Sequence, residues 1–127
     1  MSNQVVPAAP TPDKLRQLVL KALEDFKAID IQEIDVSAQN PLTDRFFIAS
    51  GSSTRHVKSM AENLVMKAKS AGLPPLGVEG QEQGEWVLVD LNDIIVHLMM
   101  PKTRAFYNLE KLWEASTNRR SSALGPA

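Results

Sequence analysis

Residues 84–113 read GEWVLVDLNDIIVHLMMPKTRAFYNLEKLW and carry the signals of a β-hairpin followed by a capped helix. Apolar runs on either side of a polar turn predict strands at Trp86–Asp90 and Ile94–Met99. Pro101 suits the first position of a helix, whose predicted buried side chains are Ala105, Phe106, Leu109 and Leu112. The stretch holds both tryptophans, the only tyrosine and one of the two histidines, but no arrangement of nucleophile, base or metal ligands. This composition indicates a recognition surface.

Two more helices and three more strands are predicted outside this stretch. Thr11 caps a helix that begins at Pro12, with the apolar stripe Leu15, Leu18, Val19, Ala22, Leu23 and Phe26. Strands are expected at residues 31–36, 44–50 and 76–79. Gly51-Ser52-Ser53 precedes a long helix that ends at a left-handed Gly72, with the stripe Val57, Met60, Ala61, Leu64, Val65 and Ala68. The order predicts an α/β domain, in which helices pack against a mixed five-stranded sheet.

The length of 127 residues suits one domain with a substantial hydrophobic core. We expect a disordered extension at residues 1–11, the α/β domain at residues 12–113 and a disordered tail at residues 114–127. No cysteine is present, which excludes disulfides, thiolate zinc sites and cysteine nucleophiles. The sequence shows no secretory signal, and no apolar run approaches the length of a membrane span. The expectation is therefore a cytoplasmic protein.

The charge distribution disfavours nucleic-acid binding. The chain has a net charge of −1, to which residues 114–127 contribute +1 and residues 1–12 nothing, so residues 13–113 carry −1 − 1 = −2. Nucleic-acid binders normally present a clustered basic face, because phosphate neutralisation supplies much of their affinity. A mildly acidic body without a lysine–arginine stripe predicts little direct nucleic-acid binding and is compatible with a basic protein partner.

Gly51-Ser52-Ser53 is the first candidate for chemistry. Free backbone N–H groups at a helix start can hold an anion, but the lysine of a P-loop and the further glycines of a dinucleotide fingerprint are missing. We therefore interpret these residues as a helix cap. A Gly-Ser before a helix is also a feature of the nucleotidyltransferase fold, whose chemistry needs two metal-binding carboxylates on a nearby strand. Here Met60-Ala61-Glu62-Asn63 lie on a helix, so the sequence predicts no catalytic residue, metal site or cofactor.

The hairpin turn and the two histidines have plain structural interpretations. Asp90 and Asp93 bracket the turn, where aspartates accept hydrogen bonds from N–H groups, and the loop offers too few oxygens for a hard metal ion. A two-residue turn would pair His97 with Trp86 on one face of the hairpin, and a three-residue turn would shift that pairing. Neither His97 nor His56 has a nucleophile and an orienting group beside it in the sequence, so neither is a strong catalytic candidate.

Six residues are candidates for a protein interface at the hairpin tip and the outer side of the last helix: Trp86, Asp90, Asp93, Arg104, Tyr107 and Glu110. Tyr107 lies off the predicted apolar stripe, with Arg104 and Glu110 three residues away on either side. An amphipathic aromatic with charged neighbours has the composition of an interface hot spot. A core tyrosine whose hydroxyl reaches solvent fits the pattern equally well. We interpret Trp113 as mostly structural.

Several ordered motifs resemble the ribosomal silencing factor family (RsfS, iojap-related). They are Thr43-Asp44, residues 51–57 (GSSTRHV), residues 75–80 (PLGVEG), residues 86–97 (WVLVDLNDIIVH) and residues 104–113 (RAFYNLEKLW). Together they cover roughly residues 13–113, most of a domain-sized chain. Asn92 stands where family members often have glycine, and both residues tolerate a positive φ.

The resemblance implies a non-enzymatic translation factor with a nucleotidyltransferase-like fold that lacks the catalytic carboxylates. It implies binding to the large ribosomal subunit through its ribosomal protein fourteen, a block of subunit association, and repression of translation under nutrient limitation. A homodimer of the free protein is compatible with it. Two alternatives stay open: an active nucleotidyltransferase, which would bind nucleotide with magnesium, and a direct RNA-binding module, which would bind naked ribosomal RNA with steep salt dependence.

Overall fold

The structure is a computed structural model that describes residues 11–38 and 40–111. The described elements follow the order α1 (Pro12–Asp25), β1 (Ile29–Asp35), β2 (Arg45–Ser50), α2 (Thr54–Ser70), β3 (Gly77–Glu79), β4 (Trp86–Asp90), β5 (Ile94–Met99) and α3 (Pro101–Tyr107). The expectations of disorder at the two ends, the burial of Leu112 and the structural role of Trp113 fall outside the described residues, apart from Thr11.

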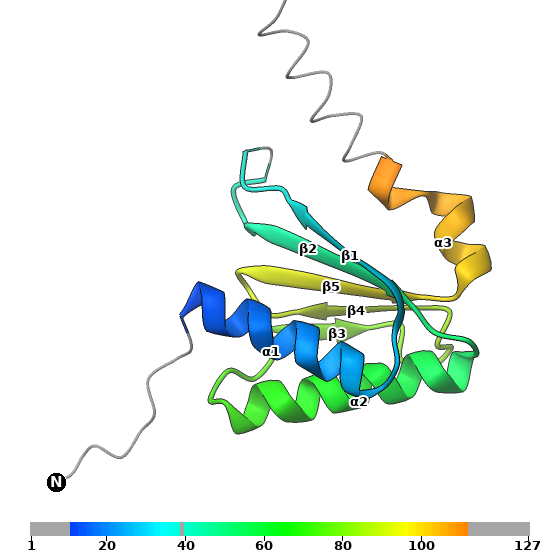
Figure 1. The fold of residues 1–127 in the computed structure, drawn as a ribbon, viewed down its shortest axis with the longest axis horizontal. Helices are drawn as coiled ribbons and strands as arrows, with labels where there is room; N and C mark the ends of the chain where they lie inside the picture. The colour runs from blue at the N-terminus through cyan, green and yellow to red at the C-terminus, as the bar shows by residue number, and fades with distance from the viewer. Residues whose placement is uncertain (1–10, 39, 112–127) are drawn as a thin grey trace, which may run out of the picture.

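The five strands form one mixed sheet with the order β1-β2-β5-β4-β3 (Figure 1). The central pair, β2 and β5, is parallel, and the other three pairs are antiparallel. A parallel pair needs a crossover connection, and α2 with the β3 and β4 strands supplies it here. The predicted α/β class with a mixed five-stranded sheet is confirmed.

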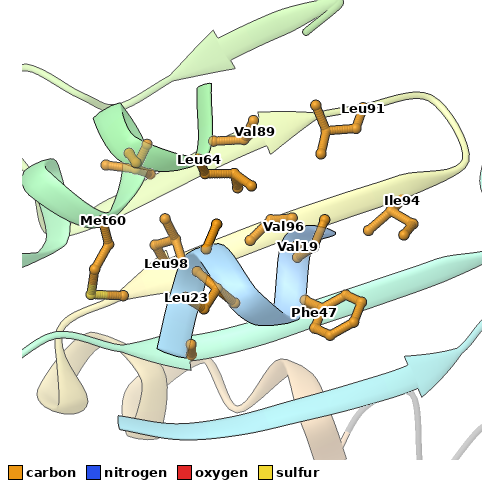
Figure 2. Packing of buried hydrophobic residues seen from close by; sticks show 14 of the residues in the cluster. Val19, Leu23, Phe47, Met60, Leu64, Val89, Leu91, Ile94, Val96 and Leu98 are labelled. Atoms are coloured by element: carbon orange, nitrogen blue, oxygen red, sulfur yellow. The ribbon is translucent and has the colours of Figure 1, made fainter. Parts of the chain in front are cut away.

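The hydrophobic core lies between one face of the sheet and the helices α1 and α2 (Figure 2). Both helical stripes are largely as predicted, because the buried residues of the two helices include Leu15, Val19, Ala22, Leu23, Val57, Met60, Ala61, Leu64 and Ala68. Alternate strand residues complete the core from the sheet: Phe47, Ala49, Val87, Val89, Val96 and Leu98. We call this the inner face of the sheet. Phe26 was wrongly placed in the stripe and is 39% exposed, because α1 ends at Asp25.

The two long helices end in the same backbone motif with different residues at its left-handed position. At the end of α2 this residue is Gly72, with φ +82°, as predicted. At the end of α1 it is Lys27, with φ +58°. There the Ala28 N–H donates to the Leu23 carbonyl and the Lys27 N–H donates to the Glu24 carbonyl, the hydrogen-bond pattern of a Schellman cap. A side chain at positive φ carries a steric cost that glycine avoids.

The strand limits agree with the sequence for the β4–β5 hairpin and differ at the first strand. β1 begins at Ile29, two residues before the expected start, because Ile29 pairs with Ser50 at the end of β2. The register of β1 shifts between Ile29 and Gln32, and Asp30 adopts a positive φ of +52° there. This irregular start interrupts the apolar pattern of the strand, so the predicted strand at 31–36 does not include Ile29 and Asp30.

The prediction for the last helix is wrong in its buried side, and the helix is interrupted at Asn108 before helical backbone resumes at residues 109–111. α3 ends at Tyr107, and Asn108 takes the left-handed conformation at φ +51°. The side chain that faces inward is Arg104, while Ala105 is exposed and Phe106 is 80% exposed. Leu109 is half-buried. The physical reason is that Arg104 finds polar partners at the end of the sheet, described below, and occupies the inward position that the apolar pattern assigned to Phe106.

Replacing Lys27 with glycine should stabilise the domain. We expect the free energy of unfolding to rise by about 0.5–1 kcal/mol, because glycine adopts the left-handed conformation without a steric cost. Urea unfolding followed by circular dichroism measures it. Lys21→Gly, inside the same helix, is the matched control and should lower stability by a similar amount. Equal destabilisation by both variants would contradict this account of the cap.

Candidate functional site

The face of the sheet opposite α1 and α2, here called the outer face, is apolar but has no layer of long helices over it (Figure 1). The strand registers place these residues on it: Phe46, Ile48 and Ser50 of β2, Ile95, His97 and Met99 of β5, and Trp86, Leu88 and Asp90 of β4. Trp86, Leu88 and Asp90 are each half-buried. The short helix α3 contacts this face at the end of β2, through Arg104 and Ser50, and at the start of β4, through Tyr107 and Trp86.

Four rings, here called the aromatic cluster, lead to the α3 end of the outer face: His97, Trp86, Tyr107 and Phe106. A fifth ring, Phe46, contacts His97 edge to face at 4.9 Å. The centroids of Trp86 and His97 lie 5.9 Å apart, and those of Trp86 and Tyr107 lie 5.0 Å apart. Tyr107 contacts Phe106 edge to face at 5.0 Å. Exposure rises along the cluster, from 6% for His97 to 54% for Tyr107 and 80% for Phe106. The cluster therefore leads from the buried sheet to solvent.

His97 orients Trp86 within this cluster. The indole Nε1–H of Trp86 donates to Nδ1 of His97 at 3.1 Å. An indole nitrogen only donates, so Nδ1 must accept and the proton of the neutral imidazole sits on Nε2. Nε2 is buried and finds no hydrogen-bond partner among the described residues. Burial lowers the pKa of His97 to about 4, so the ring stays neutral and keeps accepting from Trp86 at neutral pH.

Arg104 fixes α3 to the end of the sheet. Its guanidinium makes a bidentate pair with Glu110, with Nε–Oε1 at 3.1 Å and Nη2–Oε2 at 2.8 Å. Nη1 donates to the Ser50 hydroxyl at 3.0 Å, and Asp30 lies 3.7 Å from Nη2. The Arg104 side chain is only 8% exposed. Bidentate, charge-assisted hydrogen bonds of this kind are strong and also fix the relative orientation of the two groups. They therefore hold α3, with Phe106 and Tyr107, in one orientation against the sheet.

The two aspartates of the hairpin lie at the other end of the sheet from α3. Asp90 pairs with Ile95, four residues along β4 from Trp86, a distance of about 13 Å. Its carboxylate accepts from the Asn92 N–H at 2.9 Å, and Asn92 takes a φ of +75°. We call Asp90 and Asp93 the acidic tip.

The hairpin register differs from the direct pairing that we considered. Trp86 pairs with Met99, and His97 pairs with Leu88. The turn is centred on Asn92 and Asp93, because the Leu91 N–H donates to the Ile94 carbonyl. Trp86 and His97 therefore share a face as diagonal neighbours rather than as an opposed pair. Of the two pairings that the sequence left open, the shifted one is observed, because the turn lies one residue later along the chain than a turn at residues 91 and 92.

The structure divides the six predicted interface residues into three groups. Trp86 and Tyr107 touch within the aromatic cluster. Arg104 and Glu110 bind each other, with Arg104 buried. Asp90 and Asp93 lie at the far end. Sequence reasoning missed Phe106, which it assigned to the core. The αL-tolerant Asn108 next to Tyr107 was the available signal, because a helix that ends there cannot continue the apolar stripe.

The aromatic cluster borders a cavity and follows a segment of the chain whose charged residues are all acidic. A cavity of about 430 Å³ lies beside it, lined by Thr54, Glu85, Met100, Lys102, Thr103, Phe106 and Tyr107. Residues 71–101 contain no lysine or arginine, and their charged residues are Glu79, Glu82, Glu85, Asp90 and Asp93. The strands β3, β4 and β5 and their connections thus contribute negative charge only, whereas β2 contributes Arg45.

The start of α2 is occupied by its own capping groups. Ser53 accepts from the His56 N–H at 3.0 Å, which confirms the cap. The Ser52 N–H donates to Nδ1 of His56 at 2.8 Å, so His56 Nε2–H donates to the Phe26 carbonyl at 2.6 Å. His56 therefore links the end of α1 to the start of α2. Among residues 11–38 and 40–111, no group of three or more His, Cys, Asp or Glu side chains could hold a metal ion. Those residues also contain no helix with the length and apolarity to span a membrane.

The fold and this surface define a small mixed-sheet α/β domain that exposes an aromatic cluster beside carboxylates. Residues 9–125 match the family described as "Ribosomal silencing factor during starvation". The ribosomal silencing factor RsfS of Chromobacterium violaceum is 43% identical over 114 residues, 90% of this chain and 92% of that protein. A crystal structure of a protein from Chromobacterium violaceum has a TM-score of 0.81 at 43% identity and covers 83% of this chain and 88% of that one. The chain belongs to the ribosomal silencing factor family.

More distant relatives carry ribosome-related names as well. A mouse protein named "Mitochondrial assembly of ribosomal large subunit protein 1" is 39% identical over 101 residues, which cover 76% of this chain and 43% of that protein. The family resemblance seen in the sequence is confirmed. The family is one of translation regulators.

Removing both partners of the Arg104–Glu110 pair should destabilise the domain by less than the two single removals added together. We expect Glu110→Gln and Arg104→Met each to cost about 2–3 kcal/mol of unfolding free energy, because each leaves the other charge poorly paired. The double variant should cost at least about 1 kcal/mol less than the sum. Urea unfolding of all four proteins measures the coupling. Additive costs would show that the pair does not hold α3.

Stability should fall between pH 7.5 and pH 5 because of His97. Its pKa is about 4 in the folded protein and about 6.5 when unfolded, so the unfolded chain binds the extra proton as the pH falls. Stability is complete above pH 6.5 and decreases toward pH 4, by about 2 kcal/mol at pH 5. Urea unfolding at both pH values measures this. His97→Gln should lose that part of the pH dependence, and an unchanged dependence would contradict the assignment.

Proposed function

We propose that this protein silences translation by binding the large ribosomal subunit with the outer face of its sheet, through ribosomal protein fourteen of that subunit. The bound protein blocks association with the small subunit and represses translation under nutrient limitation. It acts in the cytoplasm by occupying a surface rather than by catalysis. The name of the family and the ribosomal name of the mouse relative support a ribosomal partner.

The observation that carries the choice of surface is the exposure of two adjacent aromatic side chains. Phe106 and Tyr107 are 80% and 54% exposed although Arg104, on the same short helix, is buried. Their placement on a helix held by a bidentate ion pair makes them rigid. Rigid, exposed aromatics beside a cavity are the usual anchors of a protein interface, where a few such side chains carry most of the binding energy.

The charge of the segment that carries β4 and β5 favours a basic protein over RNA as the direct contact. The segment 71–101 has five carboxylates and no cation, which would repel phosphates and attract lysine and arginine side chains. The row Trp86, Leu88 and Asp90 extends the surface from the aromatic cluster toward the acidic tip. This row spans about 13 Å, within the reach of a standard interface of about 800 Å² per partner.

Sedimentation with separated ribosomal particles tests the proposed function. The protein should co-sediment with free large subunits and should be absent from small subunits and from intact ribosomes, because the joined small subunit would cover its site. Chemical crosslinking of the large-subunit fraction then identifies the contacted ribosomal protein. Recovery from intact ribosomes equal to that from free large subunits would rule out the steric block.

Truncating Tyr107 should weaken binding and leave the fold intact. We expect Tyr107→Ala to cost about 2 kcal/mol of binding free energy, a roughly 30-fold weaker affinity for large subunits. Met66→Ala, which removes a side chain of similar exposure (56% against 54%) from α2, should bind like the wild type. Affinity and thermal midpoint are measured on the same preparations. A normal affinity for a folded Tyr107→Ala would place the interface elsewhere.

The acidic tip should act mainly on the rate of association. The double variant Asp90→Asn and Asp93→Asn should bind large subunits more slowly at low salt and at nearly the wild-type rate at high salt, because exposed charges are screened. Stopped-flow fluorescence at two ionic strengths measures this. A slower rate that persists unchanged at high salt would show that the tip makes a close contact instead of steering.

A further inference from the structure

A second surface lies between α2 and the edge strand β3, away from the aromatic cluster. A groove of about 550 Å³ runs between α2 and the β3 region. Its lining residues are Lys58, Ala61, Glu62, Val65, Met66, Lys69, Ser70, Val78 and Gln81. None of them belongs to the aromatic cluster or the acidic tip. Met66 is 56% exposed, so the groove presents apolar surface to solvent.

The strand beside this groove has a free edge. β3 is the last strand in the sheet order, and it pairs only with β4 among the described residues. Val78 pairs with Val89 and so points toward the inner face, where it lines the groove. The backbone N–H and C=O groups on the free edge can pair with an added strand. A groove between a helix and a free strand edge is the arrangement in which extended peptides bind by strand addition.

The two ends of the groove differ in charge. Lys58 lies at the end next to the β3–β4 connection, because it approaches the position where Gly84 would carry a Cβ. Glu79 and Glu82 are also in that region, and Glu62 lies one helical turn from Lys58. Lys69 lies at the other end, near the turn into β3, with Val65 and Met66 one turn before it. The uncompensated cation is therefore at the Lys69 end.

The dimensions fit a short extended segment. Lys69 lies eleven positions after Lys58 in α2, a length of about 16 Å. Five residues of extended chain span the same length. Pro74 and Pro75 precede β3 and offer no N–H groups, so at this end an added strand would rely on the charge of Lys69.

We propose that the groove between α2 and β3 binds an extended peptide as a sixth strand, antiparallel to β3, with its acidic carboxyl end at Lys69. Apolar side chains at alternate positions of the peptide lie over Ala61 and Val65. An antiparallel strand places its carboxyl end at Lys69 and its amino end beside Glu79 and Glu82. A parallel strand would place like charges together at both ends.

The probe is the pentapeptide Lys-Val-Thr-Val-Asp with a free carboxyl end, titrated into the isotope-labelled full chain and followed by NMR. Amide shifts should appear at β3 and along residues 58–70 and should be absent from the aromatic cluster. Peptides N-methylated at the third or at the fourth residue separate strand addition from simple apolar adsorption. Because alternate N–H groups face β3, one of the two should bind at least tenfold more weakly and the other like the parent.

A charge exchange tests the direction. Lys69→Glu should weaken binding of the parent peptide at least tenfold and should favour an amidated peptide that ends in lysine. Lys67→Glu, which alters a neighbouring exposed lysine outside the groove lining, is the matched control and should change neither affinity.

Three results would overturn the proposal. The first is the absence of shifts at β3 with the peptide at several millimolar. The second is equal binding of the two N-methylated peptides, which would reduce the groove to an apolar patch. The third is a set of shifts at β3 that depend on protein concentration without peptide, which would make a second copy of the chain the occupant. None of these outcomes bears on sedimentation with ribosomal subunits.

Discussion

The buried guanidinium of Arg104 determines how the end of the sheet meets solvent. Its bonds to Glu110 and Ser50 join α3 to β2, two elements far apart in the chain. A buried charge needs such partners, since an unpaired one costs several kcal/mol. Once Arg104 faces inward, the helical geometry turns Phe106 outward and places Tyr107 against Trp86, half-exposed. The most exposed aromatic surface among the described residues is thus a consequence of where one cation finds its hydrogen bonds.

A second buried polar group, the imidazole of His97, fixes the position of Trp86 in the same surface. His97 accepts from Trp86, and the indole supports Tyr107 at a centroid distance of 5.0 Å. Burial keeps His97 neutral at physiological pH, so the geometry of the cluster does not change with modest acidification. Arg104 and His97 together give a rigid surface on a small domain. Rigidity limits the side-chain entropy lost on binding a partner.

Much of the fold follows from local patterns in the sequence. The stripes of α1 and α2, the hairpin strands, the Ser53 cap and the left-handed Gly72 depend on neighbouring residues, and these predictions are confirmed. The errors arise where distant groups decide. The inward turn of Arg104 depends on Ser50, 54 residues away, and the hairpin register, which the sequence left open, depends on which two residues form the turn. For the candidate surface, the sequence indicated Trp86 and Tyr107 but assigned Phe106 to the core, because the apolar stripe took no account of Arg104.

Site-specific photocrosslinking from the exposed aromatic position tests the central claim most directly. A benzoylphenylalanine placed at Phe106 should crosslink to a single protein of the free large subunit, and the same probe at Met66 should give no crosslink to that protein. Both positions are exposed, at 80% and 56%, so a difference in crosslinking reports which surface contacts the subunit rather than which side chain is accessible. Crosslinks from Met66 and none from Phe106 would contradict the account, because the subunit would then cover α2 instead of the outer face.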